Sequence, residues 1–259
     1  MDLFNVNDQI QIAYSLSGNT NGPKMVLLHG LFLNSDCWKF QLSEFEPKFQ
    51  ILRFDLRGHG RSTKPPKRFT IRDYVDDMRK LLEFLHWNTE LYLVGHSLGG
   101  MIALVYAVEN PEQIKKMVIA DSFCHVTHDA TTDVISRVNN NPLDKFAMGI
   151  STRGLKPYDK EIAEYIASMV TDYMTKEDCL TATAASAGFS MCKYLKQIEI
   201  PTLVLVGNDD ITTPVWASGM IHDWLQNSEL TIIPNSGHLT IFDHPKEFNQ
   251  LTISFWEKE

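Results

Sequence analysis

Short runs of consecutive hydrophobic residues recur along the chain, with longer amphipathic stretches between them. Runs such as MVLLH and TLVLV suit strands that are buried on both faces of a mainly parallel sheet. The pattern predicts helices after the capping-box residues Thr70 and Asp73, at 101–108, and from Pro245 to Trp256. Strands are predicted at 9–15, 25–29, 50–55, 91–94, 114–120, 202–206 and 229–233. This alternation predicts an α/β fold, with helices flanking a mostly parallel central sheet.

The alternation of strands and helices breaks once, between Phe123 and about Gln197. No buried strand is evident there, while segments such as DKEIAEYIASMVTDYM have a helical pattern. A structureless loop of this length would be unusual in a compact domain. We therefore predict a helical insertion at 123–197, broken near Asn139–Pro142, within a core domain made of residues 1–122 and 198–259.

Composition and charge narrow the class of protein further. The chain has 259 residues, of which 44% are hydrophobic and 22% charged, and no apolar run approaches the ~18 residues of a membrane span. A net charge of −8 argues against a nucleic-acid partner, because phosphate binding needs a positive surface. We expect a small-molecule substrate, no membrane association, and a monomer or homodimer. The first residues carry neither a basic leader nor an apolar signal region, so we expect the protein in the cytoplasm.

The four cysteines are scattered and form no CxxC pair. Cys37, Cys124, Cys179 and Cys192 are therefore predicted to be buried free thiols rather than disulfides or metal ligands. No HExxH-type cluster is visible either, and we expect no metal.

The stretch LYLVGHSLGG carries the clearest chemical signal. A serine on a sharp turn between a strand and a helix sits in strained backbone, and its neighbours two positions away must be small. Gly95 and Gly99 meet this need around Ser97. The turn would expose the Ser97 hydroxyl beside a helix N-terminus, where negative charge is favoured. This pattern indicates a nucleophile, although a glycine-rich turn with a capping serine is the alternative.

A serine nucleophile needs a base and an acid that orients the base. Downstream, Asp209 and Asp210 follow one predicted strand, and His238 follows the next. Ligands of open α/β sheets bind at the ends of strands, so these side chains are expected near Ser97. Their order along the chain, serine then acid then histidine, favours catalysis over a structural turn.

Five motifs in order resemble the α/β-hydrolase superfamily over almost the whole chain. They are LLHGLF at 27–32, DLRGHGRS at 55–62, GHSLGG at 95–100, GNDDITTP at 207–214 and SGHLTIFDHP at 236–245. The chain looks most like the compact carboxylesterase and 3-oxoadipate enol-lactonase group, which implies a helical cap after the sixth strand and no cofactor.

The resemblance implies a role for individual residues. Ser97 matches the nucleophile and His238 the base, and the fourth position of GNDD makes Asp210 the acid, with Asp209 a turn residue. Asp121 is a third candidate acid, since some relatives carry the acid after the sixth strand. Arg57 and His59 of DLRGHGRS match a structural turn.

The oxyanion site and the substrate pocket can also be placed on the sequence. Two backbone N–H groups should bind the oxyanion, one from Leu98 and one from Leu31. Phe32, Phe123 and Leu239 adjoin the motifs and are predicted to line an apolar pocket. Trp38, Met148, Met169 and Ile211 would fit a pocket or the core equally well.

These residues predict a cofactor-independent serine hydrolase that cleaves a small carboxylic ester or lactone through an acyl-enzyme. Two alternatives stay open. The same triad could perform another reaction, such as perhydrolysis or C–C bond hydrolysis, because cap and pocket choose the substrate. The chain could also be a hydrolase-like receptor for a small molecule, with slow turnover.

Overall fold

A computed structural model of the chain describes residues 1–65 and 68–258. Its centre is an eight-stranded sheet in the order β1-β2-β4-β3-β5-β6-β7-β8. Strand β2 pairs antiparallel with β1 and β4, and every other pairing is parallel. The strands are β1 (Asp2–Asn7), β2 (Ile10–Gly18), β3 (Lys24–Leu28), β4 (Gln50–Phe54), β5 (Leu91–His96), β6 (Ile114–Ala120), β7 (Thr202–Gly207) and β8 (Ser228–Ile233).

All seven predicted strands are present, and the one that the pattern did not predict is β1. Its residues alternate between exposed and half-buried positions at the edge of the sheet. An exposed edge strand needs no hydrophobic run, because it buries little surface. The fully buried strands β5 and β7 lie nearer the middle of the sheet and carry the strong signal.

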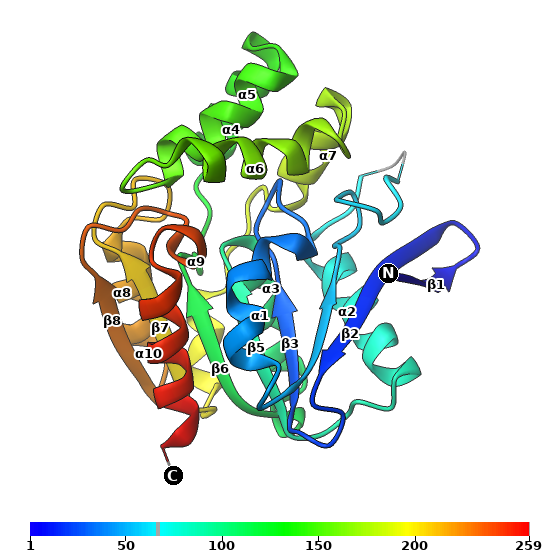
Figure 1. Cartoon of the computed structure of the whole chain (residues 1–259), viewed down its shortest axis with the longest axis vertical. Helices are drawn as coiled ribbons and strands as arrows, with labels where there is room; N and C mark the ends of the chain where they lie inside the picture. Colours follow the sequence, from blue (N-terminus) through cyan, green and yellow to red (C-terminus); the bar gives the residue numbers. More distant parts are fainter. Residues whose placement is uncertain (66–67, 259) are drawn as a thin grey trace.

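Helices cover both faces of the sheet (Figure 1). One face packs against α2 (Ile71–Phe84), α3 (Leu98–Glu109) and α8 (Val215–Trp224), and the other against α1 (Lys39–Phe45) and α10 (Pro245–Glu257). The predicted capping box of Thr70 and Asp73 begins α2. Shorter helical segments are η1 (Ser35–Trp38), η2 (Pro111–Gln113), η3 (Cys192–Gln197) and α9 (Thr240–Asp243).

Four helices follow β6 and precede β7: α4 (His128–Asn140), α5 (Leu143–Gly154), α6 (Lys160–Thr171) and α7 (Lys176–Ala185). Figure 1 shows them as a separate layer above the ends of the strands. The break predicted near Asn139–Pro142 falls between α4 and α5. Part of this layer has its own small core, in which Val138, Phe146 and Val170 are buried.

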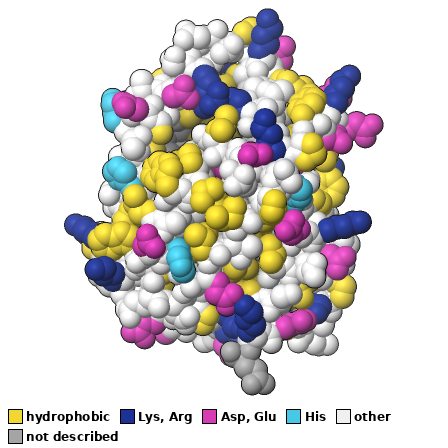
Figure 2. Space-filling model, turned by 90° about the vertical axis from the view of Figure 1, so that its left-hand side faces the viewer, with side chains coloured by type: hydrophobic (Ala, Val, Ile, Leu, Met, Phe, Trp, Pro, Cys, Tyr) yellow, Lys and Arg dark blue, Asp and Glu magenta, His cyan; other side chains and the backbone are white. Residues whose placement is uncertain are grey.

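The surface mixes charge and apolar area. In Figure 2, acidic and basic side chains alternate with hydrophobic atoms over the face shown, and basic side chains lie close to a hollow in its upper part. Among the described residues, no helix combines the length and apolar character needed to cross a membrane.

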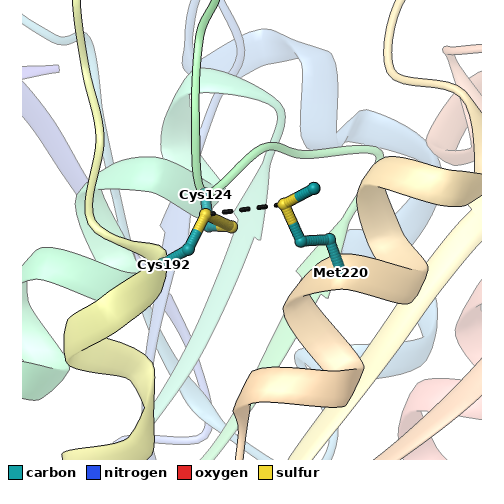
Figure 3. Close-up of a disulfide and its surroundings, with 3 residues drawn as sticks. All are labelled: Cys124, Cys192 and Met220. Carbon is teal, nitrogen blue, oxygen red and sulfur yellow. Dashed lines mark hydrogen bonds between the residues drawn. A yellow bond between two sulfur atoms is a disulfide. The ribbon is translucent and has the colours of Figure 1, made fainter.

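A disulfide corrects the prediction of four free thiols. Cys124 and Cys192, 68 positions apart, are bonded, while Cys37 and Cys179 are free and buried as predicted. The bond joins the segment entering the helical layer to the segment leaving it, and the sulfur of Met220 on α8 lies 3.7 Å from that of Cys192 (Figure 3). No local pattern indicates this pairing, because only the fold brings the two segments together.

Candidate active site

Ser97 lies between β5 and α3 in a conformation that few non-glycine residues adopt. Its φ is 52° and its ψ −114°, and positive φ at such a residue costs of order 1–3 kcal/mol. Its N–H donates to the Ala120 carbonyl (2.9 Å), and its carbonyl accepts from the Ser122 hydroxyl (2.7 Å) as well as from the Gly100 and Met101 N–H groups of α3. The strained turn predicted from GHSLGG is therefore present.

The flanking glycines are required by close approach of the backbone. A Cβ on Gly95 would collide with the Gly99 carbonyl, and a Cβ on Gly99 would collide with the carbonyl of Leu28. The first contact closes the turn on itself, and the second lets α3 pack directly on β3. Both positions need glycine because backbone atoms, unlike side chains, cannot rotate away.

The site lies where the strand order changes direction. Strand β3 pairs with β4 on one side and with β5 on the other, so the segments that follow β3 and β5 meet at one edge of the sheet. Open α/β sheets bind ligands at such a point. Here Gly30, after β3, approaches Ser97 so closely that a Cβ on it would lie 3.3 Å from the Ser97 Cβ.

The structure brings the three predicted side chains together. His238 Nε2 lies 3.1 Å from Ser97 Oγ, and His238 Nδ1 lies 2.9 Å from Asp210 Oδ2. Asp210 follows β7 and His238 follows β8, as the sequence order requires. This geometry lets His238 accept a proton from Ser97 while Asp210 binds its other nitrogen.

Asp210 is held as an anion by its own loop. Its Oδ1 accepts from the Thr212 and Thr213 N–H groups (2.7 and 2.8 Å), and its Oδ2 accepts from the Thr213 hydroxyl (2.5 Å). Burial would raise the pKa of Asp210, but the charge of His238 and these hydrogen bonds lower it to about 2. Neighbouring Asp209 is exposed, which agrees with a turn residue.

The pKa of His238 is shifted in the opposite direction. Burial would lower its pKa, yet the charge and hydrogen bond of Asp210, with smaller effects from Asp121 and Asp243, raise the pKa above its ordinary value of 6.5. The His238 carbonyl accepts a hydrogen bond from His96 Nε2 (2.8 Å). Burial lowers the pKa of His96 to about 3, so His96 acts as a neutral support.

Asp121, the third candidate acid, lies outside the hydrogen-bonded chain. Its Oδ1 accepts from the Gly207 N–H (3.1 Å) and its Oδ2 from the Thr240 hydroxyl (2.6 Å). It therefore ties β6 to the loops that carry Asp210 and His238, and no bond to His238 is found for it in the described chain.

The two predicted oxyanion donors are free. Among the described residues, neither the Leu31 nor the Leu98 backbone N–H donates a hydrogen bond. Leu98 is the first residue of α3, where N–H groups lack helical partners. Leu31 and Leu98 both line the cavity that contains Ser97 and His238.

This cavity has a volume of about 270 Å³ and lies beneath the helical layer. Phe32 and Phe123 line it as predicted. Leu239 does not: it packs in the core against Gly154, whose absent side chain leaves it space. A second, larger hollow of about 520 Å³ lies between α2, α3 and the segment after α7, and it contains neither Ser97 nor His238.

Sequence reasoning missed most of the polar lining. Two arginines, Arg137 and Arg153, face the cavity together with Asp133 and Thr183. All four belong to helices of the insertion, where no motif marks a pocket position. Ile211, which on sequence grounds fits a pocket or the core equally well, also lines the cavity.

The DLRGHGRS motif serves the scaffold. Arg57 forms a two-pronged ion pair with Asp77 of α2, with distances of 2.6 and 2.5 Å. His59 is fully buried and contacts His29 edge to face. Neither residue lines the cavity.

Several known proteins are similar to this chain. Residues 23–145 match the family described as alpha/beta hydrolase fold. The (E)-2-((N-methylformamido)methylene)succinate hydrolase of Acinetobacter baylyi is 26% identical, over 91% of both chains. The 3-oxoadipate enol-lactonase 2 of the same organism is 23% identical, over 93% of this chain and 91% of its own. The structure of a thermophilic esterase from Thermogutta terrifontis, solved with malate bound, superposes with a TM-score of 0.85 and 26% identity, covering 95% and 93%.

The fold, the strained serine turn and these similarities define one class of protein. The chain is a member of the α/β-hydrolase superfamily, as the motifs indicated. Its activity is that of a hydrolase of this type.

Proposed function

We propose that the protein is a serine hydrolase that cleaves a small carboxylic ester or lactone through an acyl-enzyme. The observation that carries the proposal is the continuous chain of contacts from Ser97 to His238 to Asp210. The esterase and the enol-lactonase among the similar proteins support this class of substrate. A cavity of about 270 Å³, at the small end for ligand sites, supports a small acyl group.

The reaction would proceed in two halves. Ser97 Oγ attacks the carbonyl carbon as its proton passes to His238 Nε2, and the Leu31 and Leu98 N–H groups bind the oxyanion. The tetrahedral intermediate collapses, and the alcohol leaves with the proton from His238. Water then gives a proton to His238 and attacks the acyl-serine, which releases the acid and restores Ser97. In a lactone the alcohol and the acid remain one molecule.

The helical layer α4–α7 would act as the cap of this site. It supplies much of the cavity lining, including Thr131, Arg137 and Ile150, and it would exclude water from the acyl-enzyme. We propose that substrate choice resides in these helices, whereas the chemistry resides in the loops after β5, β7 and β8.

Labelling with a fluorophosphonate tests the nucleophile directly. Intact mass should show one adduct on the wild type and none on Ser97→Ala. A panel of p-nitrophenyl esters and small lactones should be hydrolysed by the wild type and not by Ser97→Ala. An adduct on the mutant would assign the wrong nucleophile, whereas a reactive Ser97 with no turnover of any ester or lactone would favour another triad reaction or a receptor.

A further inference from the structure

The residues that line the cavity carry more positive charge than negative charge. Its charged lining residues, apart from His238, are Arg137 on α4, Arg153 on α5, and Asp133. Arg137 donates to Asp133 through Nε (3.0 Å), and the side chain of Arg137 is 29% exposed. One arginine thus has an acidic partner on its own helix, one turn away.

Arg153 has no such partner. Arg153 is exposed, and among the described residues its guanidinium takes part in no hydrogen bond or ion pair. Burial lowers the pKa of Arg137, the charge of Asp133 raises it, and the charge of Arg153 lowers it, and both arginines line the same cavity. Both remain charged because the guanidinium does not deprotonate in proteins. Two cations and one anion leave an excess of one positive charge in the cavity.

The backbone fixes Arg153 beside the candidate catalytic histidine. Its neighbour Gly154 ends α5, and the Gly154 carbonyl accepts a hydrogen bond from the Leu239 N–H (3.3 Å). A Cβ on Gly154 would lie 3.8 Å from the Cβ of His238. Nearby, the Lys156 N–H donates to Asp243 (3.0 Å), which also binds the Gly237 N–H (2.9 Å). The end of α5 and the His238 loop are therefore tied together at several points.

Arginine at the end of a helix also has a structural use, because it complements the helix dipole. Both arginines lie in the last turn of their helices. That use needs no cavity, and a charge near a helix end can point into solvent. Here the terminal arginines of two helices, Arg137 half-buried and Arg153 exposed, both line the cavity that also holds Ser97 and His238.

We propose that Arg153 and Arg137 bind a carboxylate on the substrate, so that the preferred substrate is a small ester or lactone carrying a free carboxyl group. This inference rests on the proposed function. Guanidinium binds carboxylate with paired, charge-assisted hydrogen bonds. The single excess charge matches a monovalent carboxylate better than a phosphate dianion. The apolar lining formed by Phe32, Phe123 and Ile150 would then contact the remaining chain.

Two substrates with the same five-carbon acyl chain test the inference. Monomethyl glutarate carries a terminal carboxylate where methyl pentanoate carries a methyl group. The wild type should have the higher kcat/KM for monomethyl glutarate, chiefly through a lower KM. In Arg153→Gln the ratio of the two kcat/KM values should fall about 10- to 100-fold, the range expected for losing a hydrogen bond to a charged group. The change should be in the same direction in Arg137→Gln.

Lys145→Gln is the matched control, because Lys145 is an exposed cation on the same helix α5 but does not line the cavity. It should leave the ratio unchanged. Equal kcat/KM values for both substrates in the wild type, or an equal fall for both in Arg153→Gln, would overturn the inference.

Binding separates this inference from the proposed function. Calorimetry should detect monomethyl glutarate binding to Ser97→Ala and a loss of that binding in Ser97→Ala/Arg153→Gln. If the wild type hydrolyses neither ester but this Arg153-dependent binding is found, the proposed function fails and the carboxylate site stands. If Ser97→Ala does not bind monomethyl glutarate while the wild type turns over methyl pentanoate, the carboxylate site fails and the hydrolase stands.

Discussion

The protonation state of His238 controls the chemistry at the scale of single residues. Asp210 stabilises the imidazolium form and raises the pKa of His238 above 6.5, while the same contact lowers the pKa of Asp210 to about 2. A histidine with a raised pKa stabilises the fold below its unfolded pKa, and this contribution is lost as the pH rises through the folded pKa. For Asp210 the contribution is present above 3.8 and is lost as the pH falls toward 2.

The activity should therefore have an acid limb set by His238. Only the neutral imidazole accepts the Ser97 proton, so kcat/KM for p-nitrophenyl acetate should fall about tenfold per pH unit below an apparent pKa higher than 6.5. Asp210→Asn should move this limb to lower pH, because it removes the charge that raises the pKa. It should also lower kcat by about 10⁴, as expected when the histidine loses its orienting carboxylate.

Asp209→Asn is the control for this prediction. Asp209 is the exposed neighbour of Asp210 and carries the same charge. Its loss should change neither the rate nor the position of the acid limb. An Asp210→Asn profile that coincides with the wild type would mean that Asp210 does not act on His238.

Single residues also show which parts of the candidate site could be predicted from the sequence. Ser97, Asp210 and His238 each follow a recognisable strand, so their positions at one edge of the sheet were predictable. Arg137 and Arg153 follow no strand and lie in helices with ordinary amphipathic patterns. Which face of such a helix lines a cavity depends on how the helix packs, and no local pattern encodes it.

At the scale of elements, the packing of α3 against β5 and β3 determines the position of Ser97. The helix packs on the sheet through backbone contacts at Gly95 and Gly99. These contacts leave no room for a side chain, so the glycines set the height of Ser97 above the sheet. The pattern of two glycines around a serine predicted the sharp turn between β5 and α3, whereas the packing of α3 on β3 is seen only in the tertiary structure.

Gly99→Ala should destabilise the protein by about 3 kcal/mol or more, since the added methyl must displace the backbone of Leu28. Urea unfolding measures the change. Gly149→Ala is the matched control: it lies within α5, and no described atom beyond its own helix backbone lies within 4 Å of its Cβ position. Alanine there should stabilise the protein by up to about 1 kcal/mol through helix propensity. Gly99→Ala with wild-type stability would contradict the close backbone contact between Gly99 and Leu28.

At the scale of the whole molecule, the disulfide links the two chain segments that connect the helical layer to the rest of the protein. Cys124 precedes α4 and Cys192 follows α7, and the two segments also pair through the Val126 N–H and Phe189 carbonyl (2.8 Å). Disulfides persist in oxidising compartments and are rare in the cytosol. This bond therefore argues against the cytoplasmic location that the sequence predicts. The location itself stays a prediction.

Removing the disulfide should lower the stability of the oxidised protein. Cross-linking residues 68 positions apart is worth about 4.4 kcal/mol by chain entropy, so Cys124→Ser/Cys192→Ser should lower Tm by roughly 9–18 °C. A reductant should lower the wild-type Tm to the same value and leave the double mutant unchanged. A reductant without effect on the wild type would show that the bond does not form.

By itself the sequence determined the α/β alternation, the strained serine turn, and the order of the three side chains of the candidate triad. Each of these is a local constraint: strand burial requires a hydrophobic run, and a sharp turn requires glycine. Only the tertiary structure decided the edge strand β1, the Cys124–Cys192 bond, the burial of Leu239 against Gly154, and the arginines in the cavity. Each of these depends on contacts between segments distant in sequence, whose neighbours are set by packing rather than by any local pattern.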